Sequence, residues 1–127
     1  MLLAVLVAAA QTTYTLPQNL HWIPLTGKGV APGGFRADIR GKENDACGQL
    51  IARKFRDGYI YPMHANGVYG IYVIIKGTLV IGFDKQHRTS GERVLPAGSV
   101  MQGLKTEPHY GRALGETIFY VYVPCSR

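Results

Sequence analysis

Apolar and polar side chains alternate along short segments of this chain. In the segment FRADIR, Phe35, Ala37 and Ile39 are expected to face a core while the charged residues between them face water. Residues 71–75 and 116–123 are continuous runs of β-branched and aromatic residues, which favour strands. No segment shows a sustained helical period. The pattern predicts an all-β protein.

Turn signals divide the rest of the chain into further short strands. Lys76-Gly77 predicts a tight turn that joins residues 71–75 and 78–83 into a hairpin. The other strands are expected at residues 35–40, 49–55, 59–63, 91–95, 99–103 and 116–123. About eight short strands with regular turns are typical of an antiparallel double-sheet barrel whose interior holds one small ligand.

Length and composition support one small globular domain. The chain has 127 residues, of which 46% are hydrophobic and 17% are charged, against about 25% charged residues in an ordinary domain. The formal net charge of +6 comes from basic residues scattered along the chain, whereas a nucleic-acid-binding protein gathers them on one element. We therefore expect no nucleic-acid partner, and a preference for an anionic small ligand stays open.

The first ten residues, MLLAVLVAAA, form an apolar stretch that ends in small residues, as export signals do. We expect residues 1–10 to be a truncated signal peptide and the protein to be periplasmic or secreted. The alternative is an apolar first strand of a cytoplasmic protein, and the stretch is too short for a membrane span. Cys47 and Cys125 are compatible either with one disulfide or with two buried thiols.

Residues 58–77 resemble the first signature of the cupin family, G-x5-H-x-H-x3-4-E-x6-G. Gly58, His64 and Gly77 stand at its first Gly, first His and last Gly. Asn66 replaces its second His and Gly70 replaces its Glu.

The second signature, G-x5-P-x-G-x2-H-x3-N, resembles the segment from Gly98 to His109, which keeps the first Gly and the His. Leu104, Thr106 and Ala113 replace its Pro, second Gly and Asn. With the flanking sequence, the resemblance to small single-domain bacterial cupins of unknown function extends over residues 22–123. It implies a cupin-type double-stranded β-helix, the jelly-roll barrel, as a single domain over residues 11–127.

In metal-dependent cupins, three His and one Glu hold Fe, Mn, Zn, Ni or Cu. Carried over to this sequence, the resemblance leaves His64 and His109, with Asn66 offering an amide oxygen. Two imidazoles make a weak, open site, so one divalent transition metal bound weakly and an inert, vestigial site are both open.

Tyrosine hydroxyls would suit a small polar aromatic or carboxylate ligand. We expect Tyr69, Tyr72 and Tyr110 to line the ligand pocket. The main hypothesis is a small-molecule-binding protein with a reduced metal site inside the barrel. The alternatives are a metal-dependent oxygenase or isomerase acting on a small organic acid, and a structural barrel without ligand that works as a homodimer.

Overall fold

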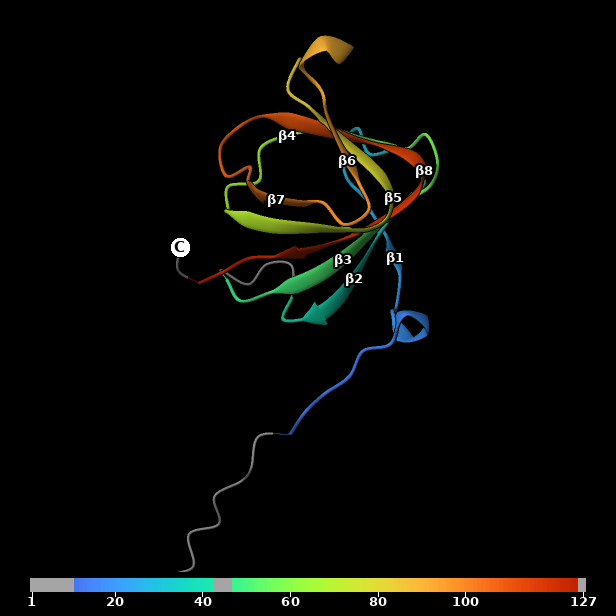
Figure 1. Ribbon diagram of the computed structural model, residues 1–127, viewed down its shortest axis with the longest axis vertical. Coiled ribbons are helices and arrows are strands. Elements are labelled where there is room, and N and C mark those ends of the chain that lie inside the picture. The colour runs from blue at the N-terminus through green and yellow to red at the C-terminus, as the bar shows by residue number, and fades with distance from the viewer. Residues whose placement is uncertain (1–10, 43–46, 126–127) are drawn as a thin grey trace, which may run out of the picture.

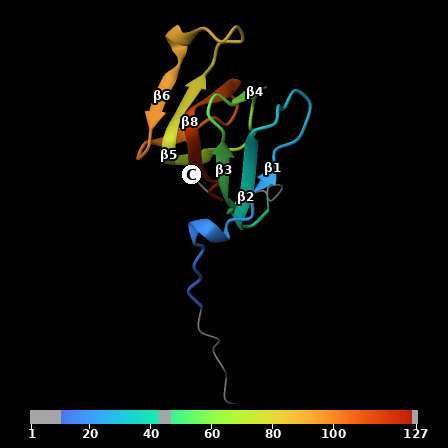
Figure 2. The same ribbon diagram turned by 90° about the vertical axis from the view of Figure 1, so that its right-hand side faces the viewer.

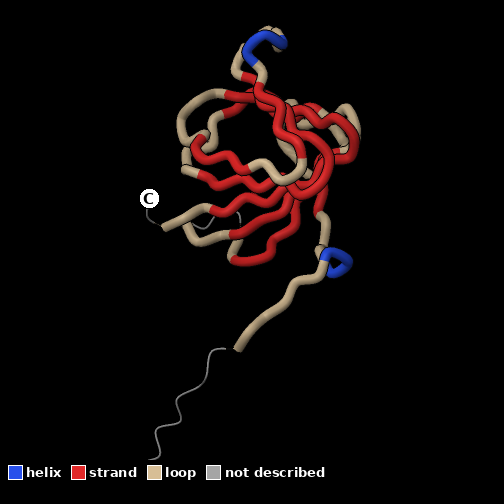
Figure 3. The backbone as a smooth tube through the Cα atoms, viewed as in Figure 1, coloured by secondary structure: helices blue, strands red, loops and turns tan. Residues whose placement is uncertain are grey.

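The computed structural model describes residues 11–42 and 47–125. Within these ranges the chain forms eight antiparallel strands and two short 3-10 turns, η1 (Pro17–Asn19) and η2 (Thr89–Gly91). The strands are β1 (Ile23–Pro24), β2 (Gly34–Arg40), β3 (Leu50–Phe55), β4 (Ile60–His64), β5 (Gly70–Gly82), β6 (Arg93–Pro96), β7 (Val100–Gly103) and β8 (His109–Tyr122). The predicted all-β class is confirmed, and the strands curve around a common centre (Figures 1 and 3).

The two long strands, β5 and β8, build both layers of the barrel. The first half of β5 pairs with β7 and with the second half of β8, which continues through β3 and β2 to β1. The second half of β5 pairs with β6 and with the first half of β8, which also pairs with β4. Figure 2 shows the two layers facing each other, with β6 on one side and β2 and β1 on the other.

The chain bends between these layers at Gly77, where the predicted hairpin is wrong. The pairing of β5 with β8 shifts register on both sides of Lys76, and the two halves of β5 pair with β8 rather than with each other. Gly77 has a φ of +71°, and a Cβ atom there would lie 2.3 Å from the carbonyl oxygen of Glu116. The glycine therefore lets one strand turn a corner of the barrel instead of ending it.

The alternating segment at residues 35–40 forms β2, and its faces match the expectation in part. Arg36 lies directly opposite Arg53 of β3, so the two side chains share a face of the sheet, the one turned to the barrel interior. Phe35 lies on the other face, half-buried, with the Lys54 ammonium 5.2 Å from its ring. Ala37, on the same face as Phe35, is fully buried as expected, whereas Asp38 is exposed.

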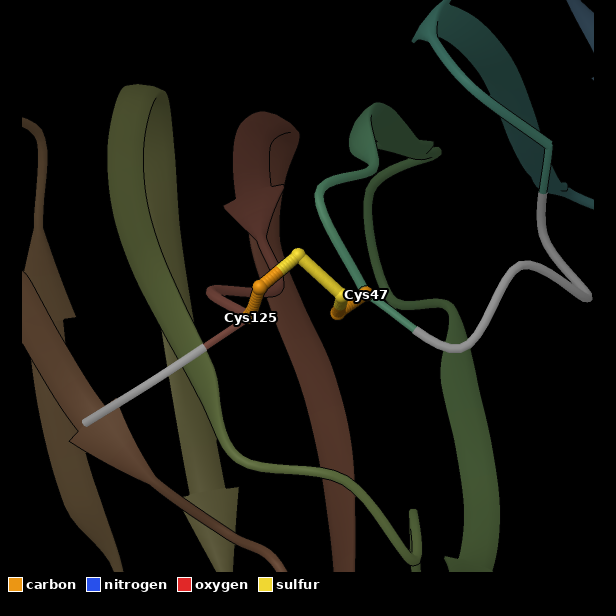
Figure 4. The surroundings of a disulfide bond; sticks show 2 residues. All are labelled: Cys47 and Cys125. Carbon is orange, nitrogen blue, oxygen red and sulfur yellow. A yellow bond between two sulfur atoms is a disulfide. The ribbon is translucent and has the colours of Figure 1, made fainter.

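A disulfide joins Cys47, which precedes β3, to Cys125, which follows β8 (Figure 4). Backbone hydrogen bonds beside it run from the Gly48 amide to the Val123 carbonyl and from the Val123 amide to the Gln49 carbonyl. The structure therefore has the disulfide, which is one of the two alternatives that the sequence leaves open for Cys47 and Cys125.

The expected export segment, residues 1–10, lies outside the described residues. In the described part of the chain, neither 3-10 turn is long and apolar enough to cross a membrane.

Candidate ligand site in the barrel

A cavity of about 300 Å³ lies between the two layers. Its apolar wall comes from β3, β5 and β8 and includes Ile51, Phe55, Leu79, Ile81, Phe119 and Val121. Its polar groups are Gln49, Arg53, Tyr61, Asn66, Tyr72 and the two histidines, His64 and His109. An apolar chamber with a few converging polar groups is the usual form of a small-molecule site.

The two histidines meet at one edge of the cavity because the sheet register places them directly opposite each other. His64 ends β4, His109 begins β8, and their ring centroids are 4.3 Å apart. The Nδ1 atom of each ring donates a 2.8 Å hydrogen bond to a backbone carbonyl two residues earlier, of Pro62 and of Glu107 respectively. These bonds fix both tautomers and leave each Nε2 as an acceptor.

The surroundings of His109 favour its neutral form. The residue is 3% exposed, and burial lowers the pKa of its imidazole below the ordinary value of 6.5, against the opposing hydrogen bond to the Glu107 carbonyl. A neutral ring at physiological pH keeps the Nε2 lone pair free to accept a proton or bind a cation.

Asn66 and Tyr72 form a second polar pair in the cavity wall. The Asn66 Nδ2 donates a 2.6 Å hydrogen bond to the Tyr72 Oη, so the phenol accepts this bond and its own proton can be donated to another group. Burial raises the pKa of Tyr72 to about 12. The hydroxyl therefore stays protonated and acts as a donor near neutral pH.

No family model matches the chain, and no curated protein matches it. Among solved structures, the polyketide cyclase RemF from Streptomyces resistomycificus is similar with a TM-score of 0.72 and 14% identity, over 92% of this chain and 82% of that one. An RmlC-like cupin from Shewanella frigidimarina is similar with a TM-score of 0.66 and 14% identity, over 92% of this chain and 95% of that one. The protein has a cupin fold. An acetylacetone dioxygenase from Acinetobacter johnsonii has a similar structure, with a TM-score of 0.68 and 15% identity over 97% and 80% of the two chains.

The cupin fold raises the question of a metal, and the residues fit one only in part. Two imidazoles that share an ion at about 2.1 Å each have nitrogens no more than about 4.2 Å apart, which the ring separation permits. Among residues 11–42 and 47–125, however, no three His, Cys, Asp or Glu side chains converge as ligands. His64 and His109 can therefore supply two ligands, and water or a bound molecule would have to supply the others.

The missing carboxylate of the cupin signature has a steric explanation at Gly70. A Cβ atom at this position would lie 2.8 Å from Cε2 of Tyr72. The Tyr72 ring thus covers the position from which a glutamate side chain would start. The cavity wall therefore has the Tyr72 phenol and the Asn66 amide where the resemblance would place a carboxylate.

Of the three tyrosines expected in the pocket, the structure places one there. Tyr72 lines the cavity, whereas the Tyr69 hydroxyl donates to Gln102 Oε1 at 3.3 Å on the surface. Tyr110 is buried on the outer side of the barrel, where its ring stacks on His87 at 4.0 Å and its hydroxyl donates to Glu92. The reason is strand alternation, because inward-facing His109 forces its neighbour Tyr110 outward.

The sequence interpretation missed the contribution of β3 to the site. Gln49, Ile51, Arg53 and Phe55 all line the cavity. Their spacing of two residues is the signal that could have found them, since one face of a strand carries every second side chain.

Proposed function

We propose that this protein binds a small organic molecule inside the cupin barrel, with the polar end of the ligand at His64, His109 and Tyr72. The observation that carries the proposal is the cavity whose wall includes both a protonated phenol and two imidazole acceptors. Such a set of groups can hold a molecule that has both a hydroxyl and a carbonyl-type oxygen.

The size of the cavity limits the ligand. A volume of about 300 Å³ corresponds to roughly ten water molecules at about 30 Å³ each, and hence to a ligand of about ten non-hydrogen atoms. The wall contains the rings of Phe55 and Phe119 in edge contact, with centroids 5.2 Å apart. A single aromatic ring with polar substituents has suitable size and shape for such a chamber.

The histidines supply hydrogen-bond acceptors and a proton-transfer route. The Nε2 of neutral His109 accepts a bond from a ligand hydroxyl and can take its proton, while the Tyr72 hydroxyl donates to a ligand oxygen. The backbone carbonyls of Pro62 and Glu107 hold both rings in position during such a transfer. The residues can thus bind and polarise a hydroxylated ligand.

A divalent transition metal at His64 and His109 is the second candidate, and with it an oxygenase or isomerase activity. The hydrogen bonds from both Nδ1 atoms to carbonyls support it, because metal-bound histidines are commonly held this way. A bound metal would act as a Lewis acid on a ligand oxygen. With two protein imidazoles, we expect affinity weaker than about 10 μM, which is roughly 7 kcal/mol of binding free energy.

The disulfide supports a location outside the cytoplasm. Structural disulfides persist in oxidising compartments, and Cys47–Cys125 would not be maintained where thiols are kept reduced. We therefore place the protein in the periplasm or outside the cell as part of this proposal. Intact mass with and without reductant tests it in protein isolated from its host, and two free thiols there would count against export.

The ligand proposal is tested by titrating 4-hydroxybenzamide, a neutral probe of ten non-hydrogen atoms, by calorimetry. Tyr72→Phe should weaken binding by about 3- to 10-fold, in keeping with about 1 kcal/mol for a neutral hydrogen bond. Tyr69→Phe removes an equal hydroxyl from outside the cavity and should change nothing. Absence of binding to the wild type, or equal losses in both variants, would contradict a ligand site at this position.

The metal candidate is tested by elemental analysis of protein purified without chelator. His64→Ala and His109→Ala should each abolish any bound Fe, Mn, Zn, Ni or Cu, whereas His21→Ala, at an exposed position, should retain it. A metal content that both cavity variants preserve would exclude these histidines as ligands.

A further inference from the structure

Arg53 introduces a positive charge into a chamber with no acidic wall. Among the described residues that line the cavity, Arg53 is the one with a permanently charged side chain, and none is Asp or Glu. It lies at the middle of β3, opposite Phe119 of β8 on one side and Arg36 of β2 on the other. Arg53 therefore brings a guanidinium group to the β3 side of the cavity.

The guanidinium of Arg53 is well suited to hold an anion in this position. It carries five N–H donors in a planar fork, so its contacts within the protein are compatible with further donors turned to the cavity. One of its nitrogens, Nη1, is buried from solvent. A fork of this kind matches the two oxygens of a carboxylate, and low-dielectric surroundings strengthen such a bond.

We propose that the ligand of this protein carries a carboxylate, held by the Arg53 guanidinium. This inference rests on the proposed ligand site and adds the ligand's charge and its anchoring residue. The planar fork matches the two oxygens of a carboxylate, whereas a phosphate would bring close to two charges into the same chamber. The ligand class is a small aromatic or unsaturated hydroxy acid.

A matched pair of probes tests the charge of the ligand. We compare 4-hydroxybenzoate with 4-hydroxybenzamide at pH 7 by calorimetry, since the two differ in charge and hardly in size. The wild type should bind the acid about 10- to 100-fold more tightly, as expected for a charge-assisted hydrogen bond. Arg53→Gln should bind both probes with similar affinity, and Arg53→Lys should keep part of the preference because it retains the charge without the fork.

Arg36→Gln is the control, because it removes the same charge from the neighbouring strand at a residue outside the cavity lining. It should retain the preference for the acid. Circular dichroism and urea denaturation of Arg53→Gln show whether the fold is intact in that variant. If Arg53→Gln does not fold, the preference for the acid over the amide is compared between the wild type and Arg53→Lys, which should show a smaller preference.

Two results would overturn the inference while leaving the ligand site in place. One is equal binding of acid and amide by the wild type, and the other is an acid preference that persists in Arg53→Gln. Failure of the wild type to bind either probe is a different result, which overturns the proposed function and this inference together.

Discussion

The two faces of β8 carry polar groups in opposite states. On the outer face, Arg112 donates two hydrogen bonds to Glu92, at 2.7 and 3.0 Å, and Tyr110 donates a third at 3.0 Å. On the inner face, His109 uses Nδ1 for a backbone carbonyl, and its Nε2 has no hydrogen bond among the described residues. The outer cluster is saturated from within the protein, whereas the inner one is open.

This difference separates stability from binding along a single strand. A buried group with all its partners in place contributes to folding, and removing one partner leaves the others unsatisfied. A group whose acceptor atom has no hydrogen bond contributes less to the stability of the fold, but this atom can accept a hydrogen bond from a ligand. We therefore expect substitutions of outward residues to lower stability and substitutions of inward residues to lower binding.

Loss of the disulfide should have the largest effect on stability. It tests how far the structure of the open cavity depends on this covalent bond. Cys47 and Cys125 are 78 residues apart, and closing a loop of that length stabilises a protein by at most about 4.5 kcal/mol in the chain-entropy model. Replacing both cysteines with Ser should lower the free energy of unfolding by up to that amount, measured by urea denaturation.

The control for this variant is the wild type under reducing conditions, which should lose a similar amount of stability. Probe binding should weaken as well, because the disulfide lies beside Gln49 and Val123, which both line the cavity. A double-serine variant as stable as the oxidised wild type would show that the cavity end of the barrel holds its structure without the bond.

The second largest effect is expected at Glu92 in the saturated outer cluster. Its side chain is 4% exposed and Arg112 is 30% exposed, so solvent screens only part of their attraction. Glu92→Gln should cost about 2 kcal/mol, because the charged partner keeps its desolvation without a counter-charge. The affinity for 4-hydroxybenzamide should be unchanged. A lower affinity in this variant would mean that the two faces of β8 are coupled.

The pH dependence of this loss identifies its electrostatic origin. The hydrogen bonds from Arg112 hold the pKa of the Glu92 carboxyl below its ordinary value of 4.5, with Tyr110 and His87 also facing it. A depressed pKa stabilises the fold above the unfolded value and loses that contribution as pH falls. The stability difference between wild type and Glu92→Gln should be constant from about pH 7 to 5 and should narrow below about pH 4.5. A constant difference down to pH 3 would indicate lost packing instead.

The sequence predicts the strands of this fold better than their connections. Period-two alternation and turn residues place the strands within one or two residues of those observed for β2, β3 and β4. The same local signals misread Lys76-Gly77 as a hairpin, because a bend in a long strand and a turn between two strands use the same residues. Which of the two forms depends on β8, which pairs with both halves of β5 from about 40 residues away.

For the site, motif positions predicted the histidine pair and missed its surroundings. His64 and His109 come together as expected because strand register fixes them. Tyr69 and Tyr110 were assigned to the pocket by residue type, whereas the direction of each side chain depends on its place in the pleat. The sequence analysis did not predict Arg53 in the pocket, because a charged residue on an alternating strand normally faces water. Only closure of the barrel turns that face of β3 inward.

The smallest stability effect is expected at the histidines themselves. His64→Gln and His109→Gln each remove one hydrogen bond to a carbonyl, and a glutamine amide is polar enough to replace part of it, so we expect changes within about 1 kcal/mol. Each variant should bind 4-hydroxybenzamide more weakly than the wild type, whereas Glu92→Gln, with its larger loss of stability, should bind it normally. A loss of about 2 kcal/mol or more in the histidine variants with unchanged binding would reverse the comparison. The inner pair would then be a structural element of the barrel, and the binding site would have to lie elsewhere along the cavity.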